Sequence, residues 1–220
     1  MDIAQIEANL KNPDFQYRLQ GIKALKDYDS EVAVPLLVNS LNDSEFLVRS
    51  FVAMGLGKQQ TTESFAALMQ IMKLDNTPNV RAEAANSLSL FGRIAVSHLV
   101  LAFYQDDHWL VRRSILGALA EMNSPEELLD VCIEAFKGED SGVAESAVNA
   151  LGMLADSTQH DAALSQLLAL VNHESEFMRS RVAYALKKFD QPEAKEALQQ
   201  LRGDENHKVV GAALEDLLEE

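Results

Sequence analysis

Apolar residues recur along the whole chain at helical spacing, with no alternating pattern of strand length between them. Segments such as "VAVPLLVNSL" and "ELLDVCIEAF" place apolar residues three and four positions apart, which predicts amphipathic helices. Short stretches rich in Asp, Asn, Ser, Gly and Pro separate these segments, and such residues start and stop helices. The pattern predicts an all-α protein.

One nine-residue segment occurs seven times, at intervals of 31 to 35 residues. Its second residue is Arg in five copies, its last residue is always Leu, and the residue before that Leu is small in six copies. The copies are YRLQGIKAL (17–25), VRSFVAMGL (48–56), VRAEAANSL (80–88), VRRSILGAL (111–119), VAESAVNAL (143–151), MRSRVAYAL (178–186) and VVGAALEDL (209–217). Chance does not align seven leucines at this period, so the chain is built from repeats.

A second apolar helical segment precedes each copy, so each repeat is expected to be a helix pair. Helix pairs of this length bury their apolar faces by stacking on their neighbours, which produces an α-solenoid. We expect one domain over residues 1–220, an α-solenoid of about seven repeats wound as a right-handed superhelix. The expected repeats span roughly residues 1–29, 30–61, 62–92, 93–123, 124–157, 158–190 and 191–220.

The recurring arginine follows an acidic residue by four to six positions, as Arg49 follows Asp43. This spacing predicts a ladder of charge-assisted bonds between successive inter-helix turns. The pattern is broken at Ala144 and Val210, and a three-residue insertion near 155–160 lengthens one repeat. We assign a structural role to the arginines of this ladder, which are Arg18, Arg49, Arg81, Arg112 and Arg179.

The chain of 220 residues is acidic, with 19 Lys and Arg against 34 Asp and Glu and a net charge of −15. This charge repels nucleic acid and favours partners with basic patches, although a solvated acidic surface explains it equally well. The single cysteine, Cys132, lies in an apolar helical stretch and is expected to be buried. The N-terminal segment has no secretory pattern, and no apolar run is long enough for a transmembrane segment, which indicates a cytoplasmic protein.

The motif VRxxAxxALGxxG after an acidic turn resembles the short HEAT-like repeat of the phycobilin lyase superfamily. "NDSEFLVRSFVAMGLGK" and "AESAVNALGML" carry the motif most plainly, and the resemblance covers the whole chain. The length, the number of repeats and the phrase "WLVRRSILGALAEM" are most similar to the phycobilisome-degradation proteins of the NblB type. The resemblance implies no tightly bound cofactor, phycocyanobilin as candidate ligand, and phycocyanin or allophycocyanin subunits as partners. It also implies a place at the thylakoid surface, reached through the phycobilisome.

The second helix of each pair is expected to line the concave face that solenoids use for binding. We call the second residue of each aligned segment, which is Arg in five copies, the ladder position. The side chain five residues after the ladder position should point outward. The side chains one and two residues after it extend the same surface. Its residues mix aromatic, Met, amide and Arg side chains, which is more typical of a contact surface than of a solvated face, although an ordinary surface remains the alternative. The predicted contact residues are Phe51, Met54, Glu83, Asn86, Trp109, Arg113, Glu145, Asn149, Arg181 and Tyr184.

A bilin ligand would need cations for its propionates, acceptors for its pyrrole N–H groups and rings for stacking. Arg113 and Arg181 could pair with the propionates through their planar guanidinium groups. The two glutamates of the set could accept from the pyrroles, and Trp109 or Tyr184 could stack on the pigment. For Trp109 the alternative is a packing role at the start of its helix, because Phe residues stand near the same turn in other repeats.

No catalytic signature such as GxSxG, a P-loop or GxGxxG occurs in the chain, and the five histidines are not spaced as a metal site. Whether the protein is an enzyme is therefore left open. Three functions remain. The first is a protein that binds bilin or phycobiliprotein and acts in phycobilisome degradation or chromophore detachment. The second is a bilin lyase or lyase subunit that attaches phycocyanobilin to a phycobiliprotein cysteine, and the third is a non-catalytic interaction scaffold.

Overall fold

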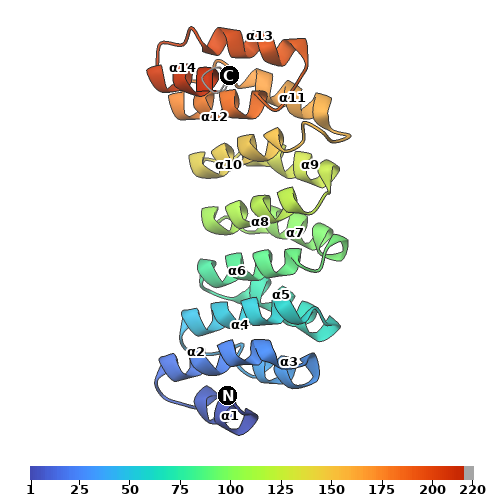
Figure 1. The fold of residues 1–220 in the computed structure, drawn as a ribbon, viewed down its shortest axis with the longest axis vertical. Coiled ribbons are helices and arrows are strands. Elements are labelled where there is room, and N and C mark those ends of the chain that lie inside the picture. Colours follow the sequence, from blue (N-terminus) through green and yellow to red (C-terminus); the bar gives the residue numbers. More distant parts are fainter. Residues whose placement is uncertain (216–220) are drawn as a thin grey trace. The chain divides into compact units, whose positions relative to one another are not determined.

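The computed structural model describes residues 1–215, and within this range it contains α-helices, one short 3-10 helix and no strand (Figure 1). The helices form seven consecutive pairs, which confirms the all-α repeat architecture. The first helices are α1 (Ile3–Leu10), α3 (Ser30–Val38), α5 (Thr62–Leu74), α7 (Arg93–Gln105), α9 (Pro125–Ala135), α11 (His160–Ala169) and α13 (Pro192–Leu201). The second helices are α2 (Phe15–Ala24, continued by η1, Leu25–Asp27), α4 (Phe46–Gln59), α6 (Pro78–Ser89), α8 (Trp109–Glu121), α10 (Ser141–Gly152), α12 (Glu176–Leu186) and α14 (His207–Leu214).

The chain divides into two compact units, Met1–Ala118 and Leu119–Glu220, and the boundary falls within α8. In the first unit α2 packs against α4, α4 against α6, and α3 against α5. In the second unit α10 packs against α12 and α12 against α14, while α11 contacts both α9 and α13. Each unit is therefore built by stacking equivalent helices of successive pairs. The single domain and the right-handed superhelix stay predictions.

The leucines that end the repeated segment form the centre of the packing in both units. Removing such a side chain to Ala costs about 2–5 kcal/mol, because both transfer energy and packing are lost. Leu217, the last of the aligned leucines, lies outside the described residues. The described members are all 1% exposed or less: Leu25, Leu56, Leu88, Leu119, Leu151 and Leu186.

Small residues next to these leucines let successive second helices approach closely. A Cβ atom added to Gly57 of α4 would lie 2.8 Å from the Cβ of Ser87 on α6. A Cβ added to Gly152 of α10 would lie 3.1 Å from the Cα of Ala185 on α12. In these two places a glycine that follows the aligned leucine packs against the small residue that precedes the leucine of the next repeat.

Polar residues fix the starts of the helices. The Asp14 carboxylate accepts a hydrogen bond from the Gln16 N–H at the start of α2, and the Asp140 carboxylate accepts one from the Val143 N–H at the start of α10. Before α7 the chain turns through Gly92 at a φ of 68°, a conformation that glycine adopts without steric cost. The two aspartate caps set the register of α2 and α10, and so decide which of their side chains face solvent.

Candidate functional site

The residue five positions after the ladder position is exposed in every repeat, on the second helix or, for Glu215, directly after it. We call this set the outward row. Its members differ in chemistry, and only Lys23 and Glu215 carry a charge. The outward row consists of Lys23, Met54, Asn86, Gly117, Asn149, Tyr184 and Glu215.

In the first unit the structure brings Trp109 and Arg113 together on α8. The Arg113 guanidinium lies 5.6 Å from the centre of the indole, and the His108 ring stacks against the same Trp at 5.8 Å. Trp109 is the first residue of α8, as Phe46 is of α4, and 43% of its surface is exposed. An exposed indole with a cation beside it offers one apolar and one charged contact to the same ligand or partner.

On α6 the predicted site residues Glu83 and Asn86 are half-buried and exposed, respectively. Burial raises the pKa of the Glu83 carboxyl, and a hydrogen bond with Ser87 only partly opposes this rise. Carboxyl groups whose pKa is raised hold their proton to higher pH, and so can donate as well as accept a hydrogen bond. Glu83 therefore combines a half-buried position with a carboxyl whose pKa is raised.

In the second unit the structure pairs two predicted residues, Arg181 on α12 and Glu145 on α10. The Arg181 Nε lies 3.6 Å from the Glu145 Oε2, and both side chains are partly exposed. Tyr184 lies one turn further along α12 with 45% of its surface exposed, and the Lys187 ammonium is 5.1 Å from its ring centre. Asn149 is exposed on α10. This group combines an aromatic ring, two cations, an amide and a carboxylate.

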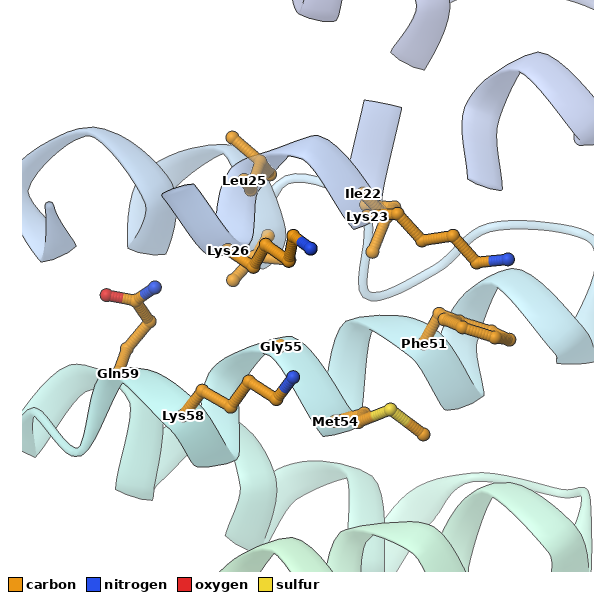
Figure 2. Close-up of a pocket in the computed structure, with 10 residues that line it drawn as sticks. Ile22, Lys23, Leu25, Lys26, Phe51, Met54, Gly55, Lys58 and Gln59 are labelled. Carbon is orange, nitrogen blue, oxygen red and sulfur yellow. The ribbon is translucent and has the colours of Figure 1, made fainter. Parts of the chain in front are cut away.

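Phe51 and Met54 line a small open cavity between α2 and α4 of the first unit, shown in Figure 2. Three lysines line the same cavity: Lys23, Lys26 and Lys58. The repeat pattern of the sequence does not reveal this lysine cluster, because Lys26 and Lys58 occupy different register positions of two successive repeats. An alignment of the two successive repeats that contain α2 and α4 would have placed these three lysines near one another.

The ladder arginines have a regular geometry. In four of them the guanidinium Nε and Nη2 donate to the two oxygens of one Asp in the following turn. Their Nη1 also donates to a backbone carbonyl of their own turn. The aspartate lies six residues before the ladder position of the next repeat. The four pairs, with Nε–Oδ2 distances of 2.6–2.7 Å, are Arg18–Asp43, Arg49–Asp75, Arg81–Asp106 and Arg179–Asp204.

In three of these pairs, Arg18–Asp43, Arg49–Asp75 and Arg179–Asp204, the pKa values of both members are shifted. For Asp43 and Asp75 burial alone would raise the pKa, but hydrogen bonds from the partner arginine and from a backbone N–H outweigh it, so the pKa is lowered. For Asp204 the hydrogen bond from Arg179 is the largest effect, and the pKa is also lowered. The same bonds raise the pKa of the arginines. Both partners are therefore charged at neutral pH, and the bonds are charge-assisted.

Arg112 departs from this geometry. The sequence places Gly138 six residues before the next ladder position, where the other pairs have Asp, and a Gly offers no carboxylate. The Arg112 Nε is buried without a hydrogen-bond partner among the described residues, and its guanidinium lies 4.3 Å from the ring centre of Phe103. Likewise Ala144 has no guanidinium, and the corresponding position in the next turn is His173. The register thus explains where the ladder is complete.

Other candidate chemistry is sparse. Cys132 is fully buried in α9, and burial raises the pKa of its thiol, so it is an inert apolar group rather than a nucleophile. Among residues 1–215, no group of three or more His, Cys, Asp or Glu side chains is placed to hold a metal ion. In that same range none of the helices has the length and apolar character needed to span a membrane.

Comparisons with known proteins extend this description. A family model of HEAT repeats matches residues 3–93 and 130–219. The complex of CpcE and CpcF of phycocyanin lyase from Nostoc sp. PCC7120 is similar in structure, with a TM-score of 0.55 and 21% identity, over 100% of this chain and 88% of that chain. An engineered protein is similar with a TM-score of 0.53 and 18% identity, over 97% and 67% of the two chains. At these identities the likeness concerns the fold. No curated protein matches the sequence.

Proposed function

Because the chain belongs to the HEAT-repeat family, we propose that it is a binding protein that holds phycobiliprotein subunits, or the bilin they carry, on its exposed second helices. The observation that carries this proposal is the chemistry of the outward row and its neighbours. A solvated face would carry mainly Lys and Glu, whereas this row offers Met54, Asn86 and Tyr184. Exposed aromatic residues and arginines are the residue types that anchor protein and ligand contacts.

A bilin fits the residues that the structure brings together in each unit. In the first unit Arg113 could bind a propionate while Trp109 stacks on a pyrrole ring. Independently, in the second unit Arg181 could bind a propionate of a bilin or a carboxylate of a partner protein, with Tyr184 beside it. Glu83, whose pKa is raised by burial, could exchange a hydrogen bond with pyrrole nitrogens. No residue is assigned a covalent step.

Within this proposal, the first role is in phycobilisome degradation, by loosening or detaching the chromophore, as the sequence resemblance to the NblB type implies. Such a role would place the protein at phycobilisomes on the thylakoid surface. The second role is that of a bilin lyase subunit that attaches phycocyanobilin. The structural likeness to a phycocyanin lyase complex over the whole chain supports this second role as a candidate.

An optical experiment separates these roles. Purified protein is mixed with phycocyanobilin, and the visible absorption band is followed before and after addition of apo-phycocyanin. A shifted band without covalent transfer supports pigment handling in detachment, and covalent attachment to the apoprotein supports the lyase role. Loss of bilin from holo-phycocyanin on incubation supports detachment directly. An unchanged spectrum in every mixture contradicts bilin binding and leaves a protein-interaction scaffold.

A further inference from the structure

The cavity between α2 and α4 has an apolar lining and a volume of about 190 Å³. Ile22 and Leu25 line it from α2 and η1, and Phe51 and Met54 line it from α4 (Figure 2). Met54 has 37% of its surface exposed, so the apolar lining is open to solvent. Exposed apolar surface inside a pocket is typical of a binding site.

The cavity owes its shape to Gly55 on α4. A Cβ atom at this position would lie 2.9 Å from the Leu37 Cδ2, so glycine lets α3 pack closely beneath the cavity. Sites that bury most of a drug-sized ligand measure about 300–1,000 Å³. A space of 190 Å³ is smaller than that range, and it suits one large apolar side chain rather than a whole pigment.

Three lysines surround this apolar lining. Lys23 and Lys26 come from α2 and η1, and Lys58 comes from α4. Figure 2 shows the side chains of Lys26 and Lys58 extending into the space between these elements. The Lys23 Nζ lies 4.6 Å from the Phe51 ring centre. All three are exposed, and none forms an ion pair with a described residue.

This cluster has the opposite sign to the chain as a whole, which carries a net charge of −15. A general acidic surface attracts basic partners, whereas this place attracts carboxylates. Nucleic acid is disfavoured, because the rest of the protein repels a long phosphate backbone. Charge complementarity and the size of the cavity therefore point to the same kind of occupant, a short anionic segment with one apolar anchor.

We propose that the cavity binds an acidic peptide segment of a partner protein. One large apolar side chain of the segment fills the space beside Phe51 and Met54, and flanking Asp or Glu residues pair with Lys23, Lys26 and Lys58. An apolar anchor in a pocket with charges at the rim is the usual arrangement of a peptide contact, in which the anchor supplies affinity and the rim supplies selectivity. The inference goes beyond the proposed pigment role, since it requires no bilin.

The test uses three synthetic peptides and the full chain labelled with ¹³C at its methionine methyl groups. The first peptide, EELFEE, has the anchor and the acidic flanks. The second, EEAAEE, has the same charge without the anchor, and the third, KKLFKK, has the same anchor with the opposite charge. We expect the Met54 methyl signal, assigned with Met54→Leu, to move on titration with EELFEE. Binding of either other peptide should be weaker by about tenfold or more.

A charge-reversal variant with a matched control completes the test. The triple variant Lys23→Glu, Lys26→Glu, Lys58→Glu should lose affinity for EELFEE by about tenfold or more. Added salt should strengthen its residual binding, whereas it should weaken binding by the original chain. The control reverses three exposed lysines of the second unit, Lys137, Lys195 and Lys208, and should bind like the original chain.

Three outcomes would overturn the inference. They are equal binding of EELFEE by both triple variants, binding of KKLFKK at least as tight as that of EELFEE, and displacement of EELFEE by octanoate at equal concentration. The last result would make the site one for small amphiphilic carboxylates. None of these measurements contains pigment, so their failure is distinct from a failure of the proposed bilin role.

Discussion

The Nε of Arg49 lies 2.6 Å from the Oδ2 of Asp75, although the two residues are 26 positions apart in the chain. The bond ties the start of α4 to the turn before α6, and Asp75 also accepts a hydrogen bond from the Thr77 N–H. One carboxylate thus shapes its own turn and receives the arginine of the previous repeat. The contact links successive repeats at the edge of the helical stack.

Removing one ladder arginine should be costly, and removing Arg112 should not be. Arg49→Met leaves the Asp75 carboxylate part-buried without its cation, and we expect a loss of about 3 kcal/mol in unfolding free energy. Arg112→Met removes a buried Nε that lacks a partner and places a thioether on Phe103, and we expect a change within about 1 kcal/mol. Urea unfolding followed by circular dichroism measures both. Equal losses of unfolding free energy in the two variants would contradict a stabilising ion pair at Arg49 that Arg112 lacks.

Acid should weaken the ladder. The pKa of Asp43, Asp75 and Asp204 is lower in the folded protein than in the unfolded chain, so the unfolded chain takes up protons first as the pH falls. The stabilisation is fully present above the ordinary Asp pKa of about 3.9 and is lost as the pH falls through the folded values. We expect the unfolding free energy to decrease steeply between about pH 5 and pH 2.

A double variant provides the control for this acid effect. Arg49→Met with Asp75→Leu removes one pair entirely, so the decrease of its unfolding free energy with falling pH should be smaller than that of the original chain. Identical pH dependence in the two proteins would show that the Asp75 carboxylate contributes nothing to acid unfolding.

Glu83 should behave in the opposite sense. Because burial raises its pKa, the folded state holds the proton more tightly than the unfolded chain does, and its favourable contribution is lost as the pH rises through the folded value. Glu83→Gln should therefore be more stable, relative to the original chain, at pH 7 than at pH 4. The measurement is unfolding free energy at both pH values, with Glu196→Gln on α13 as a control for loss of an exposed acidic charge. A larger relative gain at pH 4 would contradict the raised pKa.

The fold could be predicted because its cause is periodic. The aligned leucines, the small residue before six of them and the acidic turns recur at nearly one interval. In the part of the chain that the structure describes, these features pack the second helices or cap their starts. The partners of the ladder arginines were harder to predict from the sequence. The sequence places Asp43 six residues before Arg49, yet Asp43 receives Arg18, because stacking brings each arginine to the next turn.

The candidate site was only partly predictable for a similar reason. The repeat register indicates which residues of a second helix face solvent, and Trp109 with Arg113 share one helix at a spacing of one turn. The pairing of Glu145 with Arg181 and the cluster of Lys23, Lys26 and Lys58 join different repeats. They depend on the axial offset between neighbouring helices, which spacing along the chain does not specify.

If the exposed second helices hold a phycobiliprotein or its bilin, the protein binds phycocyanin subunits, and a calorimetric titration with these subunits tests this claim. The double variant Arg113→Glu with Arg181→Glu is compared with Arg93→Glu with Lys195→Glu, which makes the same charge change on the first helices α7 and α13. We expect the original chain and the control to bind alike, and the double variant to lose affinity by about tenfold or more. Equal affinity of all three proteins, or no binding by the original chain, would contradict the claim.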